Sequence, residues 1–132
     1  MRRLLLFCVI MLALMLVGVS CEKEVPKDIA AQTAREYYSN LYSGKYEAFV
    51  SGMYFPDSIP DSYHRQLVDN MKMFVAEQKD KHHGVYDVRI ARYNTDSVAH
   101  ATDVFLILCY GDSVNEEIVV RMIEHDGKWL MK

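Results

Sequence analysis

Residues 98–110 read VAHATDVFLILCY, and this stretch decides the fold. Its second half, 104–110, is apolar at nearly every position, which is typical of a strand that is covered on both faces. We therefore expect a long central strand over 98–110. In the preceding segment, 86–91, apolar residues alternate with polar or small ones, which predicts a half-buried strand that ends in a turn at 94–96.

Two more strands follow the central one. Residues 111–113 read Gly-Asp-Ser and predict a turn, after which 116–125 has the composition of a third strand. The dipeptide Asp126-Gly127 is a strong signal for a tight hairpin, and 128–132 can form the closing strand. Successive hairpins of this kind predict a four-stranded antiparallel meander.

Three helices are expected before the strands. Apolar residues recur at helical spacing over 28–43, a short helical turn covers 46–50, and a long helix covers about 59–81. Asp57 or Ser58 can cap the long helix. Because helices and strands are segregated along the chain, the fold class is α+β, with the three helices packed on one face of a curved sheet.

The N-terminus has the pattern of an export signal. Arg2 and Arg3 precede an apolar run over 4–19, and small residues precede Cys21. The 16-residue run is shorter than the roughly 20 residues that a transmembrane helix needs. Residues 1–20 are therefore predicted to be a signal peptide rather than a permanent span.

Residues 18–21 read Gly-Val-Ser-Cys and resemble the bacterial lipobox, although that motif usually has Leu where Gly18 stands. The resemblance implies that signal peptidase II cuts before Cys21, which becomes the lipidated N-terminus. Residues 21–28 would then be a short tether, and 29–132 a domain attached to the cell envelope by several fatty chains. The alternative is plain secretion with Cys21 as an ordinary residue. The sequence does not indicate whether an anchored domain would face the periplasm or the outside of the cell.

Composition and cysteine usage agree with this division. Hydrophobic residues make up 51% of the 132 residues, and many of them lie in 4–19. Loss of 1–20 would change the formal net charge from −3 to −5, which argues against a nucleic-acid partner. With Cys8 removed and Cys21 lipidated, Cys109 would have no disulfide partner, and we expect this thiol to be buried and inert.

The segment 41–48, LYSGKYEA, followed by a long helix and by strands that end in HDGKW at 125–129, resembles the nuclear transport factor 2-like (NTF2-like) superfamily over 28–132. The resemblance implies a cystatin-like cone in which a bent sheet wraps the long helix and leaves a pocket at its open end. That superfamily includes isomerases, dehydratases and non-catalytic domains, some of them on bacterial lipoproteins. The fold therefore does not fix the function.

Asp103 is the candidate catalytic residue that the resemblance suggests. Inside the cone it could act as general base with Tyr38 as proton donor, because an apolar surround raises the pKa of a carboxyl group. The alternative is an ion pair with Arg121 or Arg89 on the sheet face. His100 is expected on the opposite face of the strand from Asp103, so the two cannot easily form a dyad.

Two functions follow from these observations. The preferred one is a membrane-anchored, non-catalytic module that binds a small apolar ligand or a protein, with a possible homodimer through the sheet face. The alternative is a cone-pocket isomerase or dehydratase that uses Asp103. No cofactor and no metal are expected, since His82 and His83 are adjacent and cannot converge on one ion. The expected pocket lining is Tyr38, Tyr42, Tyr54, Met71, Phe74 and Asp103.

Overall fold

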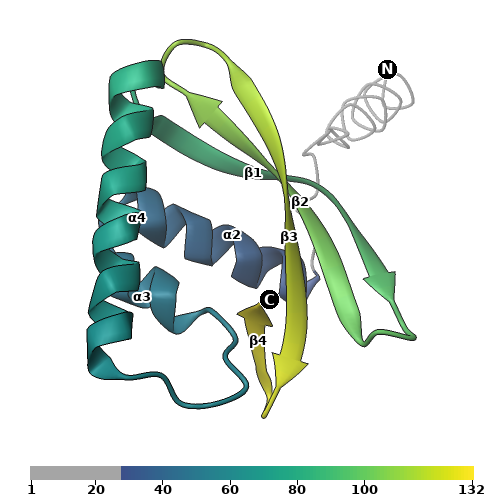
Figure 1. The fold of residues 1–132 in the computed structure, drawn as a ribbon. Coiled ribbons are helices and arrows are strands. Elements are labelled where there is room, and N and C mark those ends of the chain that lie inside the picture. The colour runs from purple at the N-terminus through teal and green to yellow at the C-terminus, as the bar shows by residue number, and fades with distance from the viewer. Residues whose placement is uncertain (1–27) are drawn as a thin grey trace, which may run out of the picture.

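The structure is a computed structural model that describes residues 28–132, in which three helices precede four strands (Figure 1). The helices are α2 (Ile29–Tyr42), α3 (Tyr46–Ser51) and α4 (Asp61–His82), and the strands are β1 (Val85–Asp96), β2 (Ala101–Tyr110), β3 (Asn115–His125) and β4 (Lys128–Met131). The α+β prediction is confirmed. The expected signal peptide 1–20, Cys21 and nearly all of the tether lie outside the described residues. Within 28–132, no helix is long and apolar enough to cross a membrane.

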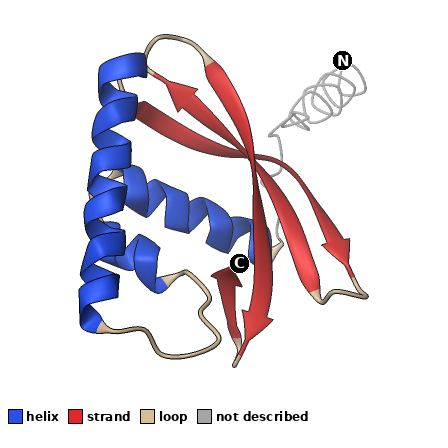
Figure 2. Ribbon diagram, in the orientation of Figure 1, coloured by secondary structure: helices blue, strands red, loops and turns tan. Residues whose placement is uncertain are grey.

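The four strands form one antiparallel sheet in the order β1-β2-β3-β4, as the meander prediction requires (Figure 2). β1 changes register twice, between Val85 and Asp87 and between Ile90 and Arg92. Such bulges bend a strand and increase its twist. The sheet is consequently curved, and its concave face receives the helices.

The two faces of the sheet differ in cover. Alternate β2 residues from Thr102 to Tyr110 face the helices and are buried. Their neighbours Phe105 and Ile107 face outward and are only half-buried, so the expectation that 104–110 is covered on both sides is wrong. All three helices lie on the inner face, and Phe105 is covered outside by the Arg92 guanidinium, 4.0 Å from its ring centre. The expected homodimer contact on this outer face stays a prediction.

The helix inside the concave face is α2, not the long helix that the resemblance implied. α2 contacts all four strands and lies between α4 and the sheet (Figure 1). Three alanines on its inner side, Ala30, Ala31 and Ala34, are fully buried, and such small residues allow the helix to approach the sheet closely. By contrast, Val68 is the one α4 residue that is fully buried. The longest helix therefore stands at the rim of the cone.

Two boundaries differ from those expected. β1 continues to Asp96, so residues 94–96 are not a turn; they pair with β2 instead. The turn lies at 97–100, where the Asp96 carboxylate accepts hydrogen bonds from the Val98 and Ala99 amides at 3.1 Å and His100 has a left-handed φ of 51°. The turn shifts because Asp96 supplies acceptors for the two amides that follow it.

The long helix also begins later than expected. Its N-cap is Pro60, whose extended backbone (ψ 149°) leads into a helix that starts at Asp61. No side chain caps this end, so the expected capping by Asp57 or Ser58 is wrong. Asp61 supplies a negative charge in the first turn instead, which is favourable at the positive end of the helix dipole.

Leu106 tests the position of the core. It is fully buried on the inner face, whereas Val119 is 59% exposed on the outer face of the neighbouring strand. Leu106→Ala should lower the free energy of unfolding by about 2–5 kcal/mol, because it leaves a cavity in the core. Val119→Ala should change it by less than about 0.5 kcal/mol. Urea unfolding measures both, and equal losses would contradict the assignment of the faces.

Candidate functional site

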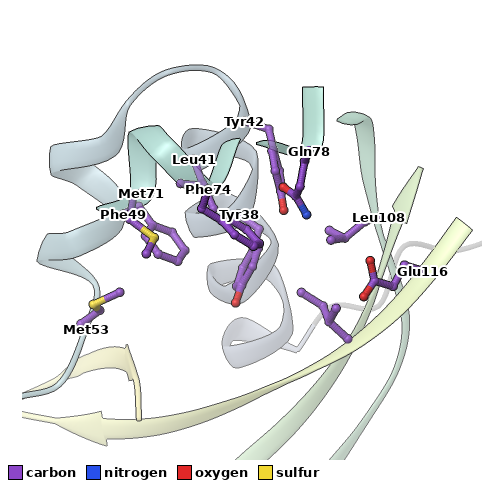
Figure 3. Close-up of a pocket in the computed structure, with 11 residues that line it drawn as sticks. Tyr38, Leu41, Tyr42, Phe49, Met53, Met71, Phe74, Gln78, Leu108 and Glu116 are labelled. Atoms are coloured by element: carbon purple, nitrogen blue, oxygen red, sulfur yellow. The ribbon is translucent and has the colours of Figure 1, made fainter. Parts of the chain in front are cut away.

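A cavity of about 330 Å³ lies between the helices and the inner face of the sheet (Figure 3). Helices α2, α3 and α4 supply most of its wall, and β2, β3 and Met53 in the loop after α3 supply the rest. The wall is largely apolar, with a few polar groups, which is the usual composition of a small-molecule site. The lining residues are Tyr38, Leu41, Tyr42, Phe49, Met53, Met71, Phe74, Gln78, Leu108, Glu116 and Ile118.

Four of the residues expected in the pocket line it: Tyr38, Tyr42, Met71 and Phe74. Tyr54 does not, because it lies beside β4. Its amide donates a hydrogen bond of 2.7 Å to the Met131 carbonyl, and its ring packs edge-on against His125 at 5.3 Å between ring centres. The placement of Tyr54 in the pocket is therefore wrong.

Asp103 is also outside the pocket. It pairs with Arg121 in the β2–β3 register, and the Arg121 guanidinium donates to both of its carboxylate oxygens at 3.1 and 3.2 Å. Arg89 is bound instead to Asp87, at 3.0 Å. His100 lies in the turn before β2 rather than in the strand. Because Asp103 is ion-paired and faces away from the cavity, the isomerase or dehydratase that uses it as base does not fit this structure.

A polar cluster lies at the pocket wall, and it is not evident from the sequence. The Gln78 side-chain amide donates to the Tyr110 hydroxyl at 3.0 Å, and that hydroxyl donates a short hydrogen bond to the Glu116 carboxylate. Gln78 stands four residues after Phe74 and seven after Met71, so helical spacing alone puts all three on one face of α4. Glu116 is harder to predict, because Glu117 follows it directly and the sequence does not show which of the two lies on the inner face. The pairing of Glu116 with the buried Leu108 decides this.

Two buried polar atoms of this wall, the Tyr42 hydroxyl and the Gln78 carbonyl oxygen, make no hydrogen bond of ordinary geometry with the described residues. Burial raises the pKa of Tyr42, although the Gln78 side chain lies close enough to act on that pKa in the opposite direction. Figure 3 shows these two side chains next to each other. A buried polar group without a partner costs about 1–3 kcal/mol. These two atoms mark the polar side of an otherwise apolar cavity.

The phenols in this region stay neutral over a wide pH range. Burial is the main cause that raises the pKa of Tyr42, and burial also raises the pKa of Tyr38. For Tyr110, burial comes first and the hydrogen bond to Glu116 second, and together they raise its pKa to about 12. At neutral pH these groups can donate and accept hydrogen bonds but carry no charge.

The end of α4 is fastened to the β2–β3 hairpin, which fixes Gln78 against Tyr110. The Gly111 amide donates to the Gly84 carbonyl at 2.9 Å, and the Asp112 amide donates to the His82 carbonyl at 3.1 Å. The His82 ring lies 2.8 Å from the Asp112 carboxylate, which lowers the pKa of that carboxyl group, and its centre is 4.5 Å from that of the Tyr110 ring. We call these contacts the clasp.

The clasp explains the role of the two adjacent histidines that the sequence presents. His82 holds the hairpin, and His83 ends the helix in the left-handed conformation with φ 61°. A Cβ at position 111 would lie 2.7 Å from the His83 carbonyl oxygen, so the close approach requires Gly111. In the described part of the chain, no three His, Cys, Asp or Glu side chains are placed to hold a metal ion.

Comparison with solved structures shows the fold family. The chain superposes on a crystal structure described as a "Putative NTF2-like transpeptidase" from Campylobacter jejuni with a TM-score of 0.64 and 18% sequence identity. The match covers 79% of this chain and 97% of the other. The domain therefore has the NTF2-like fold, with a cone pocket. No family model and no curated protein matches the sequence.

The neutral Tyr110 hydroxyl makes stability depend on pH. Its contribution is fully present below the ordinary tyrosine pKa of 10.0 and is lost as the pH rises towards about 12. At pH 8, Tyr110→Phe should lower the free energy of unfolding by about 1–3 kcal/mol, since Gln78 and Glu116 lose their partner. Urea unfolding should show a smaller difference between variant and wild type at pH 11. A difference that grows with pH would contradict the assignment.

Proposed function

We propose that this chain is a lipid-anchored, non-catalytic binding protein whose NTF2-like domain takes a small apolar ligand in the cone pocket. The observation that carries the proposal is the pocket itself. It is lined mostly by aromatic and aliphatic side chains, and the Tyr42 hydroxyl and Gln78 carbonyl oxygen in its wall are buried without partners. Such a surface gains free energy when an apolar molecule replaces water, and the polar atoms orient the molecule.

The positions of the candidate catalytic residues support a non-catalytic role. Asp103, the expected base, is paired with Arg121 away from the pocket. A transpeptidase, the activity in the name of the Campylobacter jejuni structure, transfers an acyl group through an activated nucleophile. Cys109 is free and buried, and none of the hydrogen bonds found within residues 28–132 joins it to a base. The pocket offers binding groups rather than a nucleophile and base.

The proposed anchor rests on the sequence before the domain. Arg2, Arg3 and the apolar run 4–19 precede Cys21, whose neighbours resemble a lipobox. The first helix of the domain begins at Ile29, so seven residues separate it from Cys21. An extended chain spans at most about 3.6 Å per residue. The tether would thus hold the domain within roughly 25 Å of a membrane surface.

Phe74 tests ligand binding in this pocket. It lines the cavity but is 42% exposed, whereas its neighbour Met73 is 70% exposed and does not line it. A neutral apolar probe, 4-phenylbutanol, should bind the wild-type chain. Phe74→Ala should weaken this binding about fivefold, since about 1 kcal/mol of apolar contact is lost.

Met73→Ala is the matched control and should leave the affinity within about twofold of wild type. Isothermal titration calorimetry of the full chain in a non-ionic detergent gives the affinities, and the same detergent in every sample cancels partition into micelles. If Phe74→Ala and Met73→Ala weaken binding equally, the pocket is not the ligand site.

Cys21 tests the anchor. Cys21→Ala removes the thiol that would receive the lipid, so the protein should move from the membrane fraction to the soluble fraction of a bacterial host. Lipid labelling of the wild type with a radioactive fatty acid should also disappear in the variant. Wild-type protein that carries no label, or variant protein that stays in membranes to the same extent, would overturn lipidation at this residue.

A further inference from the structure

We propose that the ligand of the cone pocket carries a protonated amine as its polar head on an apolar body. This inference rests on the proposed function, that is, on the pocket being a ligand site. It deepens that function by naming the chemical class of the ligand. Three features of the pocket carry it: its one charge, the kind of polar atoms that are unsatisfied, and the aromatic wall.

The charge of the pocket is negative. Glu116 is the one charged residue among the eleven that line the cavity. Its carboxylate accepts a hydrogen bond from the neutral Tyr110 hydroxyl, and no lysine, arginine or histidine of the described chain forms an ion pair with it. The neighbouring Glu117, on the other face of β3, is paired with Arg92 at 2.9 Å. Glu116, which lines the pocket but is itself exposed to solvent, thus lacks the cation that Glu117 has.

The free polar positions at the wall are mainly acceptors. The Gln78 amide nitrogen is used by Tyr110, which leaves the Gln78 carbonyl oxygen unsatisfied. The Tyr42 hydroxyl, which can donate as well as accept, lies beside Gln78, and Glu116 has a second carboxylate oxygen beside the one that Tyr110 binds. A primary ammonium group has three donors and no acceptor, so it matches this set. A carboxylate head has only acceptors and would face the Glu116 charge.

The polar groups lie together because the Tyr110 hydroxyl joins them. It accepts from Gln78 and donates to Glu116, so both side chains are within hydrogen-bond distance of one oxygen atom. The clasp holds this arrangement from behind through His82, whose ring packs on Tyr110. A single head group can therefore contact the helix side and the strand side of the wall at once.

The apolar part of the wall suits the body of such a ligand. Tyr38 and Phe49 pack edge to face with ring centres 5.2 Å apart, and Phe74 and Met71 extend the surface along α4. The electron-rich face of an aromatic ring also attracts a cation. At about 330 Å³ the cavity is near the lower end of ligand sites, which run from about 300 to 1,000 Å³. A small aryl-alkyl amine fits this volume.

A second depression on the other side of Tyr42 and Gln78 has the opposite charge. Lys72 and Lys79 line it, together with Tyr46. An anionic molecule would be attracted there rather than to the side of Glu116. The wall formed by Tyr42 and Gln78 therefore separates a negatively charged pocket from a positively charged depression, and this separation gives the amine its preference for the pocket.

The test compares two probes of the same shape at pH 7, 4-phenylbutylamine and 4-phenylbutanoate. The amine is protonated and the acid is ionised at this pH. Isothermal titration calorimetry of the full chain in a non-ionic detergent should show the amine binding at least about tenfold more tightly, equal to about 1.4 kcal/mol. Phe74→Ala should weaken amine binding, which places it in the pocket.

Glu116→Gln should remove most of the tenfold preference, because the charge is lost while the carbonyl oxygen can still accept from Tyr110. Glu117→Gln loses the same charge from the outer face and should keep the preference. Equal affinities for amine and acid, or a preference that survives Glu116→Gln, would overturn the amine proposal while 4-phenylbutanol binding still supports a ligand pocket. If none of the three probes binds, the proposed function fails and the amine proposal fails with it.

Discussion

The structure depends on the clasp between the end of α4 and the β2–β3 hairpin. α4 is the longest helix, yet it buries only Val68 fully, so its packing against the rest of the domain is slight. What fixes its C-terminal end is a set of directed contacts: the amides of Gly111 and Asp112 donate to the chain at 82–84, and His82 binds the Asp112 carboxylate. Hydrogen bonds to charged groups contribute more than those between neutral groups, so the contact of His82 with the Asp112 carboxylate strengthens the attachment of the helix end to the hairpin. The pocket is the space that this arrangement leaves open.

The clasp also accounts for the chemistry of the pocket. By fixing α4 it places Gln78 on Tyr110, and Tyr110 in turn binds Glu116. Because its pKa is raised, the buried Tyr110 phenol stays neutral. It can therefore accept a hydrogen bond from the Gln78 amide and donate one to the Glu116 carboxylate at the same time. The result is a wall with one negative charge and with Tyr42 and Gln78 atoms unsatisfied. In the proposed function, a site of this kind selects a ligand by the sign of its head group.

Much of the fold can be predicted from the sequence, because hydrophobic period and turn residues report local structure. Two signals are sufficient to predict helices followed by strands, and hence the α+β class. They are the change from helical to alternating spacing of apolar residues and the hairpin signal at Asp126-Gly127. The end of β1 near 94–96 and the start of α4 after Pro60 are harder to predict from the sequence. Residues such as Asp96 and Pro60 are compatible with several turn conformations, and the sequence alone does not decide among them. The site is predictable only where helical spacing exposes it, as for Met71 and Phe74. Whether Asp103 or Glu116 faces the pocket depends on strand register, and a shift of one residue reverses the answer.

In the proposed complex, the ligand's amine lies against Glu116 in the pocket beside the clasp. A crystal structure of the chain with 4-phenylbutylamine would show this placement. We expect the phenyl ring among Phe49, Met71 and Phe74, and the nitrogen within hydrogen-bond distance of the Glu116 carboxylate. An amine bound in the depression lined by Lys72 and Lys79, or a nitrogen that points to solvent away from Glu116, would contradict it.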